Sequence, residues 1–288
     1  MESLRDIRRN IKSVRATQQI TYTMKMVAAA RVKKAQSAIL SARPFASKLE
    51  EMVSSLAGLE AAAGGSTRML LEPQEGPAGL ILVTSDKGLC GSFNAWIFRA
   101  ASAWLKRRGG SPVRAFAVGR KGRDFLRRLR FPGLQIVYES VGVFPNAGYV
   151  HAELLGRAVV SECLSGKLGG VTVIYNEFKS LLSQTLRERI LVPVSAGKSA
   201  AAGPPAGFEP APELLFDSLL PRHVKAQLYR ILLESQAAEL AARRNAMESA
   251  SKNAGDIIGE LTLRLNKTRQ AMITQELTEI MGGAEALK

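Results

Sequence analysis

The chain has 288 residues, 46% of them apolar, and its 40 Lys and Arg against 25 Asp and Glu give a formal charge of +15. That apolar content is enough for a hydrophobic core and excludes wholesale disorder, and no run of about 18 apolar residues is present to span a membrane. Two cysteines are too few for a disulfide framework or a metal site of their own, and the charge favours an acidic partner such as nucleic acid, anionic lipid or an acidic protein surface.

Residues 1–57 are predicted to form one long helix. No proline precedes Pro44 and no glycine precedes Gly58, and these two residue types are the strongest helix breakers. We expect Pro44 to bend or interrupt the helix.

The same segment carries a coiled-coil seam, because apolar residues step along it by 3, 4 and 3 positions at Leu4, Ile7, Ile11 and Val14. The next seam positions are polar. We therefore expect apolar contact to resume on a shifted phase, at Ile20, Met24 and Val27.

Residues 76–194 alternate between short apolar runs and helical segments. Strands are predicted at 80–83, 113–118, 134–138, 171–175 and 185–194, and helices at 93–108, 120–130 and 149–164. Such alternation predicts a mostly parallel, Rossmann-like sheet. Residues 58–75 are predicted to be a connector, and residues 195–213, with four prolines, a flexible linker.

Residues 214–288 form the last predicted segment, with a helix over 214–281 that ends at Gly282 and Gly283. Part of its seam is rich in small and polar residues, at Ala238, Ala242, Asn245 and Ser249. We expect this narrow seam to pack closely against another helix.

Length then decides the arrangement of the two terminal helices. A helix of about 65 residues is roughly 98 Å long, whereas a compact chain of this size is only about 50 Å across. We therefore predict an α/β fold class in which a long antiparallel coiled coil of the N- and C-terminal helices accompanies a Rossmann-like α/β globular domain.

Candidate chemistry is sparse. Gly197-Lys198-Ser199 resembles the end of a phosphate-binding loop, but the glycine required five positions earlier is Val192. Cys90 follows the first strand, where α/β proteins often bind ligands, yet neither His151 nor His223 is tied to it by a motif. We predict no catalytic residue, no cofactor site and no metal site.

Positive charge gathers in two regions. Residues 99–130 carry 11 Lys or Arg and one acid, and residues 1–48 carry 11 against two acids. At this point a nucleic-acid-binding coiled-coil protein and a nucleotide-dependent enzyme both remain open alternatives. The first would bind nucleic acid in a salt-dependent way, and the second would bind or turn over a ligand when purified alone.

Three segments together resemble the gamma subunit of the rotary F-type ATP synthases. They comprise residues 7–14 with 17–21 and 24–30; residues 84–91, with the sequence Thr-Ser-Asp-Lys-Gly-Leu-Cys-Gly; and residues 250–255 with 261–263 and 266–277. They occur in the order and at the spacing of that family, from one end of the chain to the other. One departure is Ser92, where the family often has glycine.

The resemblance implies a central stalk, or rotor shaft, that has no active site and no cofactor. Proton flow turns the rotor, and the asymmetric shaft drives ATP synthesis or hydrolysis on a ring of alpha and beta subunits. The implied partners are those subunits, the epsilon subunit and the membrane rotor ring of c subunits, and not nucleic acid. The implied location is peripheral, on the cytoplasmic side of a bacterial cell (inner) membrane.

The resemblance also suggests which residues contact the alpha/beta ring. Arg269 and Gln270 match the family position that touches loops of the catalytic subunits, and Met24 is expected at the same level on the opposite helix. Asp86 and Lys87 are expected to contact the ring from the base of the shaft. Small or apolar side chains near the tip would slide in a hydrophobic collar, namely Met272, Ile273, Ile280 and Met281.

Overall fold

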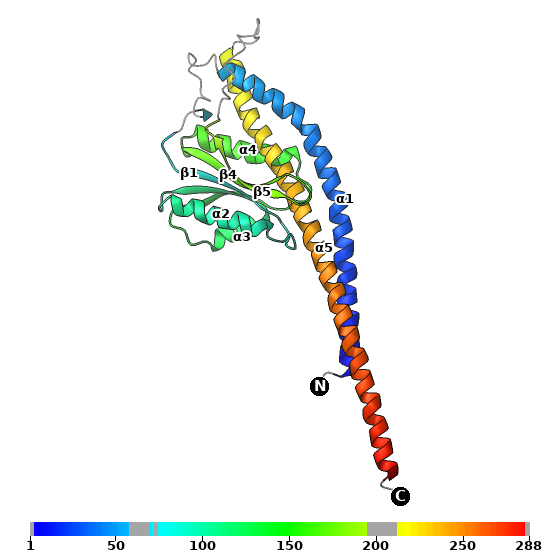
Figure 1. The fold of residues 1–288 in the computed structure, drawn as a ribbon. Coiled ribbons are helices and arrows are strands. Elements are labelled where there is room, and N and C mark those ends of the chain that lie inside the picture. Colours follow the sequence, from blue (N-terminus) through cyan, green and yellow to red (C-terminus); the bar gives the residue numbers. More distant parts are fainter. Residues whose placement is uncertain (1–2, 58–69, 72–73, 195–211, 286–288) are drawn as a thin grey trace. The chain divides into compact units, whose positions relative to one another are not determined.

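The computed structural model describes residues 3–57, 70–71, 74–194 and 212–285 (Figure 1). The chain divides into two compact units, Met1–Ala28 with Arg244–Lys288, and Ala29–Arg243, and each is treated by itself. We call the first the helix-pair unit and the second the α/β unit. The predicted connector 58–75 and linker 195–213 lie almost entirely outside the described residues.

Two long helices occupy nearly the predicted residues, α1 over Leu4–Ala57 and α5 over Pro212–Glu285. Of the two outcomes predicted for Pro44, a bend or an interruption, the interruption is wrong, because α1 continues through this exposed proline. Proline removes one helical hydrogen bond, and at an exposed position the freed carbonyl can bond to water. The predicted end of α5 is also wrong, since the helix passes through Gly282 and Gly283, which weaken a helix without forbidding it.

The α/β unit holds a five-stranded sheet of order β3-β2-β1-β4-β5. Its strands are β1 Ala78–Val83, β2 Val113–Val118, β3 Leu134–Ser140, β4 Gly170–Phe178 and β5 Gln184–Val192. The pairs β1–β2, β1–β4 and β2–β3 are parallel, and only β4–β5 is antiparallel. The prediction of a mostly parallel, Rossmann-like sheet is confirmed.

Helices cover both faces of this sheet (Figure 1). Side chains of a strand alternate between faces, so Leu80 and Leu82 of β1 pack with α2 Phe93–Arg107 and α3 Arg120–Arg128. Ile81 and Val83 face the other way and pack with α4 Tyr149–Leu164 and the first part of α5. The first part of α5 is thus a core helix of the α/β unit.

Two of the four predicted seam residues of α5, Ala238 and Ala242, do not face α1 as the predicted coiled coil required. Ala238 and Ala242 are buried in the cluster formed by the sheet and α2, whereas Ala237, Leu240 and Ala241 contact Val32 and Ala35 of α1. The prediction for these two residues was wrong because this stretch is buried nearly all round. Periodicity alone does not say which stripe of such a helix meets which neighbour.

The helix-pair unit confirms the start of the predicted seam and corrects its continuation. Ile7 and Ile11 are buried as predicted. The shifted phase is wrong, since Ile20 is 60% and Val27 46% exposed, while Thr21 and Ala28 are buried. The seam keeps its original heptad phase through polar and small residues.

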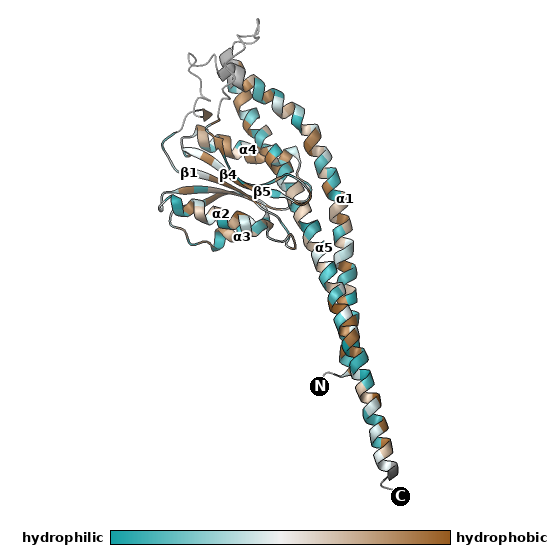
Figure 2. Ribbon diagram, in the orientation of Figure 1, coloured by the Kyte–Doolittle hydropathy of each residue, from teal (hydrophilic) through white to brown (hydrophobic). Residues whose placement is uncertain are grey.

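Contacts across the helix pair explain how polar seam positions are tolerated. Lys25 Nζ forms an ion pair with Glu248 Oε1 at 2.8 Å, and Gln18 Nε2 donates a long hydrogen bond of 3.5 Å to the Ser251 carbonyl. Gly255 leaves room for Gln18, because a Cβ there would lie 3.1 Å from its amide nitrogen. Hydrophilic and hydrophobic residues are interspersed along both helices (Figure 2).

Candidate partner-contact site

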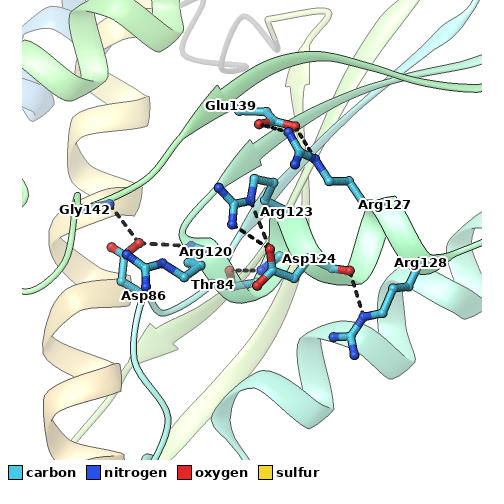
Figure 3. A network of polar contacts seen from close by, with 10 residues as sticks. Thr84, Asp86, Arg120, Arg123, Asp124, Arg127, Arg128, Glu139 and Gly142 are labelled. Carbon is cyan, nitrogen blue, oxygen red and sulfur yellow. Dashed lines mark hydrogen bonds and ion pairs between the residues drawn. The ribbon is translucent and has the colours of Figure 1, made fainter.

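The turn after β1 is organised by the carboxylate of Asp86. Asp86 Oδ1 accepts hydrogen bonds from the backbone N–H groups of Arg120 (3.0 Å) and Gly142 (2.8 Å) (Figure 3). Asp86 Oδ2 accepts one from the backbone N–H of Phe144 (2.9 Å). Asp86 is itself buried. Its carboxylate therefore joins the loops that follow three neighbouring strands, a role that sequence reasoning missed.

Thr84 fills the same edge of the sheet. Its hydroxyl donates to the Val118 carbonyl at 3.0 Å and accepts from the Gly122 N–H at 2.7 Å. A Cβ on Gly119, which has φ +90°, would collide with the carbonyl oxygen of Thr84. Parallel sheets commonly bind ligands at this edge, but here protein atoms pack it closely.

Cys90 is buried beneath the turn and is not activated. Its thiol accepts a hydrogen bond from Asn94 Nδ2 at 3.3 Å and lies 3.8 Å from Ser85 Oγ. Burial raises the pKa of the Cys90 thiol, and the thiolate is the reactive form. This environment gives no support to a nucleophilic role.

Other candidate chemistry gains no support either. Over residues 3–57, 70–71, 74–194 and 212–285, no group of three His, Cys, Asp or Glu side chains is placed to hold a metal ion. Within the same residues, no helix is long and apolar enough to cross a membrane. The Gly197-Lys198-Ser199 segment lies outside the described residues.

Part of the positive charge in residues 99–130 is paired inside the α/β unit. Four arginines form ion pairs: Arg107 with Glu188, Arg114 with Glu162, Arg123 with Asp124, and Arg127 with Glu139. Arg108 lies over the Trp104 ring, 4.7 Å from its centroid. Internal pairing thus accounts for part of a charge that first suggested an external acidic partner.

The last turns of α5 expose the predicted tip residues. Met272, Ile273, Ile280 and Met281 are 44–72% exposed, and Arg269 and Gln270 are exposed as well. All six side chains come from one continuous stretch of helix in the helix-pair unit. The structure therefore leaves all six side chains available to a partner, and their contact with the ring stays a prediction.

Met24 does not lie at the level of Arg269. The helices run antiparallel, and the Lys25–Glu248 pair sets their register. Leu4, the first residue of α1, is then level with Arg269, and Met24 lies about 30 Å further along the axis, at a rise of about 1.5 Å per residue. The expected shared level was wrong because a sequence seam does not specify the register between two helices.

Asp86 and Lys87 belong to the α/β unit, and Lys87 is exposed. Leu89, two residues on, is also exposed, and Arg243 of α5 bonds to the Gly88 carbonyl between them. Sequence reasoning missed Leu89 and Arg243. The sequence offered a signal for Leu89 alone, because this apolar residue lies between two glycines in the segment Gly88-Leu89-Cys90-Gly91.

These features define a class of protein in which two long helices accompany a Rossmann-like α/β domain, and protein atoms fill the edge of the sheet where such domains commonly bind ligands. The family model described as ATP synthase matches residues 3–287. The chain belongs to this family, in which its curated relatives are named ATP synthase gamma chain.

The relatives match over the full length of the chain. The protein from Elusimicrobium minutum (strain Pei191) is 48% identical and is covered over 99% of its length. Those from Anaeromyxobacter sp. (strain K) and Chlorobaculum parvum (strain DSM 263 / NCIMB 8327) are 44% and 41% identical, and each is covered over 100% of its length. In all three comparisons, 100% of this chain is covered.

Solved structures share the fold. A chain of the central stalk/c-ring structure of Tetrahymena thermophila mitochondrial ATP synthase matches with a TM-score of 0.60 and 28% identity, over 81% of this chain and 99% of that one. A chain of the Euglena gracilis mitochondrial ATP synthase in rotational state 3 matches with a TM-score of 0.67 and 18% identity, over 99% of this chain and 94% of that one.

Membership decides between the alternatives that the charge left open. The chain is a central-stalk subunit of a rotary ATP synthase rather than a nucleic-acid-binding protein or a nucleotide-dependent enzyme. It is non-catalytic, because catalysis in this complex takes place on the beta subunits.

Proposed function

We propose that this chain turns as the shaft inside a ring of alpha and beta subunits, and that the end of α5 is the part that the ring surrounds. The observation that carries the proposal is the exposed apolar surface of Met272, Ile273, Leu277, Ile280 and Met281. Contiguous apolar surface that a chain does not bury itself is characteristic of a binding surface. A hydrophobic collar would cover it without ionic contacts that resist sliding.

Arg269 and Gln270 stand where the helix pair ends, because Arg269 is level with the first residue of α1. Their side chains are exposed donors. Such donors can bond to acidic and hydroxyl groups of the catalytic subunits in one rotary state and release them in another. We therefore assign these two residues to the contact that is made and broken during rotation.

Met24 and the turn after β1 complete the proposed ring contacts. Met24 is half-buried, and exposed Ile20 and Val27 extend its apolar surface along α1. Lys87 offers an exposed ammonium group. The Asp86 carboxylate is committed to three backbone N–H groups, so its part in the contact is to shape the turn that presents Lys87.

We also propose the remaining partners and the location. The epsilon subunit and the membrane ring of c subunits would bind this chain outside the alpha/beta ring. The similar Tetrahymena chain comes from a structure of the central stalk with its c-ring, which supports the c-ring contact. The bacterial relatives support a peripheral place on the cytoplasmic side of the cell (inner) membrane.

Site-specific photo-cross-linking in the assembled complex tests these contacts. A photoreactive amino acid at position 270, 273 or 280 should give adducts with alpha or beta subunits. The same probe at Ser218, which is exposed near the start of α5, serves as the matched control. Tip probes that give no alpha or beta adduct, or no more than the Ser218 control, would contradict the proposal.

A further inference from the structure

The turn of residues 87–89, which we call the contact turn, is an exposed tip on a buried support. Lys87, Gly88 and Leu89 are exposed, whereas Ser85, Asp86 and Cys90 on either side are buried. The Ser85 hydroxyl donates to the Lys87 carbonyl at 2.7 Å, and Asn94 Nδ2 donates to that hydroxyl at 2.7 Å. Ser85 and Asn94 therefore hold the Lys87 side of the contact turn through hydrogen bonds between residues close in sequence.

Leu89 is held in a conformation that its side chain disfavours. Its φ is +62°, in the left-handed region, and within the described residues it is the one non-glycine residue with positive φ. It is also 62% exposed, so burial of its side chain does not explain the conformation. Backbone strain of this kind persists where surrounding contacts impose it, and it concentrates at functional sites.

Arg243 of α5 holds the other side of the contact turn. Its Nη2 donates to the Gly88 carbonyl at 3.1 Å, and its Nη1 donates to Glu239 Oε2 at 2.9 Å. The exposed fractions of the two side chains are only 13% for Arg243 and 2% for Glu239. A guanidinium held by a buried carboxylate one helical turn away is oriented before it meets the Gly88 carbonyl.

We propose that Arg243 is a positioning residue that fixes the contact turn to helix α5, so that Lys87 and Leu89 form one rigid contact with the ring. The inference rests on the proposed function for its partner and adds Leu89 to that contact. An apolar side chain beside an ammonium group fits a partner surface with an apolar depression next to a carboxylate. The partner would then meet a turn that moves with α5.

The two cysteines supply a local readout of this support. Cys90 lies beneath the contact turn, 3.9 Å from the Lys87 carbonyl, while Cys163 is buried in the cluster on the opposite face of the sheet. Opening of the contact turn should expose Cys90 alone. A general loss of stability should expose both thiols.

Thiol alkylation of the full chain therefore tests the positioning role. In Arg243→Gln, Cys90 should react about tenfold faster, as expected for the loss of a hydrogen bond from a charged donor, while Cys163 is unchanged. The Cys90 rate in Arg243→Lys should be intermediate, because lysine keeps the positive charge but lacks the forked donors of the guanidinium group. Arg230→Gln is the matched control, since Arg230 forms the equivalent i,i+4 pair with Glu234 on the same helix.

An unchanged Cys90 rate in Arg243→Gln would overturn the positioning role, as would equal acceleration of Cys90 and Cys163. The partner is tested separately, in the assembled complex, with a carboxyl-to-amine cross-linker at Lys87. Arg243→Gln and Leu89→Ala should each lower the yield of the ring adduct severalfold, and Arg230→Gln should not. Absence of any Lys87 adduct in the unmodified complex would contradict the proposed ring contact and leave the thiol result to decide the role of Arg243.

Discussion

Two segments of the same helix, α5, have opposite environments. Between Leu219 and Ala242 most side chains are buried, and they join the two core clusters of the sheet and the contact with α1. Between Leu263 and Gly283 most are exposed, although Ile273, Leu277, Ile280 and others are apolar. Burial is therefore decided by what surrounds each segment and not by apolar content.

The difference separates two tasks along one element. The first segment stabilises the fold, because its apolar side chains are removed from water within this chain. The last segment leaves comparable side chains in water, and a partner has to cover them. Substitutions in the first segment should therefore lower stability, and those in the last should affect the complex while leaving the isolated chain unchanged.

The largest expected loss of stability comes from Asp86→Ala in the α/β unit. It leaves three backbone N–H groups, in the segments that follow β2 and β3, without their acceptor, at a cost of about 4 kcal/mol in unfolding free energy. Both tryptophans, Trp96 and Trp104, lie on α2, so denaturation followed by tryptophan fluorescence reports on this unit.

Two variants serve as controls for this experiment. Asp256→Ala, at an exposed position of the helix-pair unit, should change the free energy by less than about 0.5 kcal/mol. Asp86→Asn should fall between the alanine variant and the unmodified chain, because the amide keeps one acceptor oxygen. Equal losses for Asp86→Ala and Asp256→Ala would contradict the structural role of Asp86.

The next effect compares the two segments of α5 directly. Leu228→Ala removes a fully buried side chain and should cost about 3 kcal/mol. Leu277→Ala removes a side chain that is already exposed and should cost less than about 0.5 kcal/mol. Circular dichroism during denaturation follows both segments at once, and similar losses in the two variants would remove the contrast.

A smaller effect concerns pH and the buried His223 of α5. Burial lowers its pKa; Glu50 of α1 raises it and Arg189 of β5 lowers it. The unfolded chain, with the ordinary His pKa near 6.5, then binds the proton more readily than the folded chain. The stability contributed by neutral His223 is present above that pH and is lost as the pH falls toward the folded-state value.

His223→Gln should therefore flatten the acid side of the stability profile. Between about pH 7.5 and about pH 5.5, the variant should lose less unfolding free energy than the unmodified chain, by at most about 1.4 kcal/mol. Tryptophan fluorescence during denaturation at both pH values measures the difference. Equal losses in the two proteins would exclude His223 as the titrating group.

Local pattern predicted the elements well and their contacts less well. Helix breakers and apolar runs placed both long helices and all five strands, because those signals lie within each segment. The buried phase around Thr21 was missed, since it depends on Glu248 and Ser251 of the other helix. The tip residues were predicted through family resemblance, whereas Leu89 and Arg243 depend on a bond between residues 155 positions apart.

The central claim is that the exposed end of α5 transmits force to the ring through Arg269 and Gln270. The most direct test is ATP-driven rotation of single complexes that carry Arg269→Ala with Gln270→Ala. We expect lower torque and weaker coupling, with the unfolding of the isolated chain unchanged, because both side chains are exposed. Normal torque and coupling in this double variant would contradict the account.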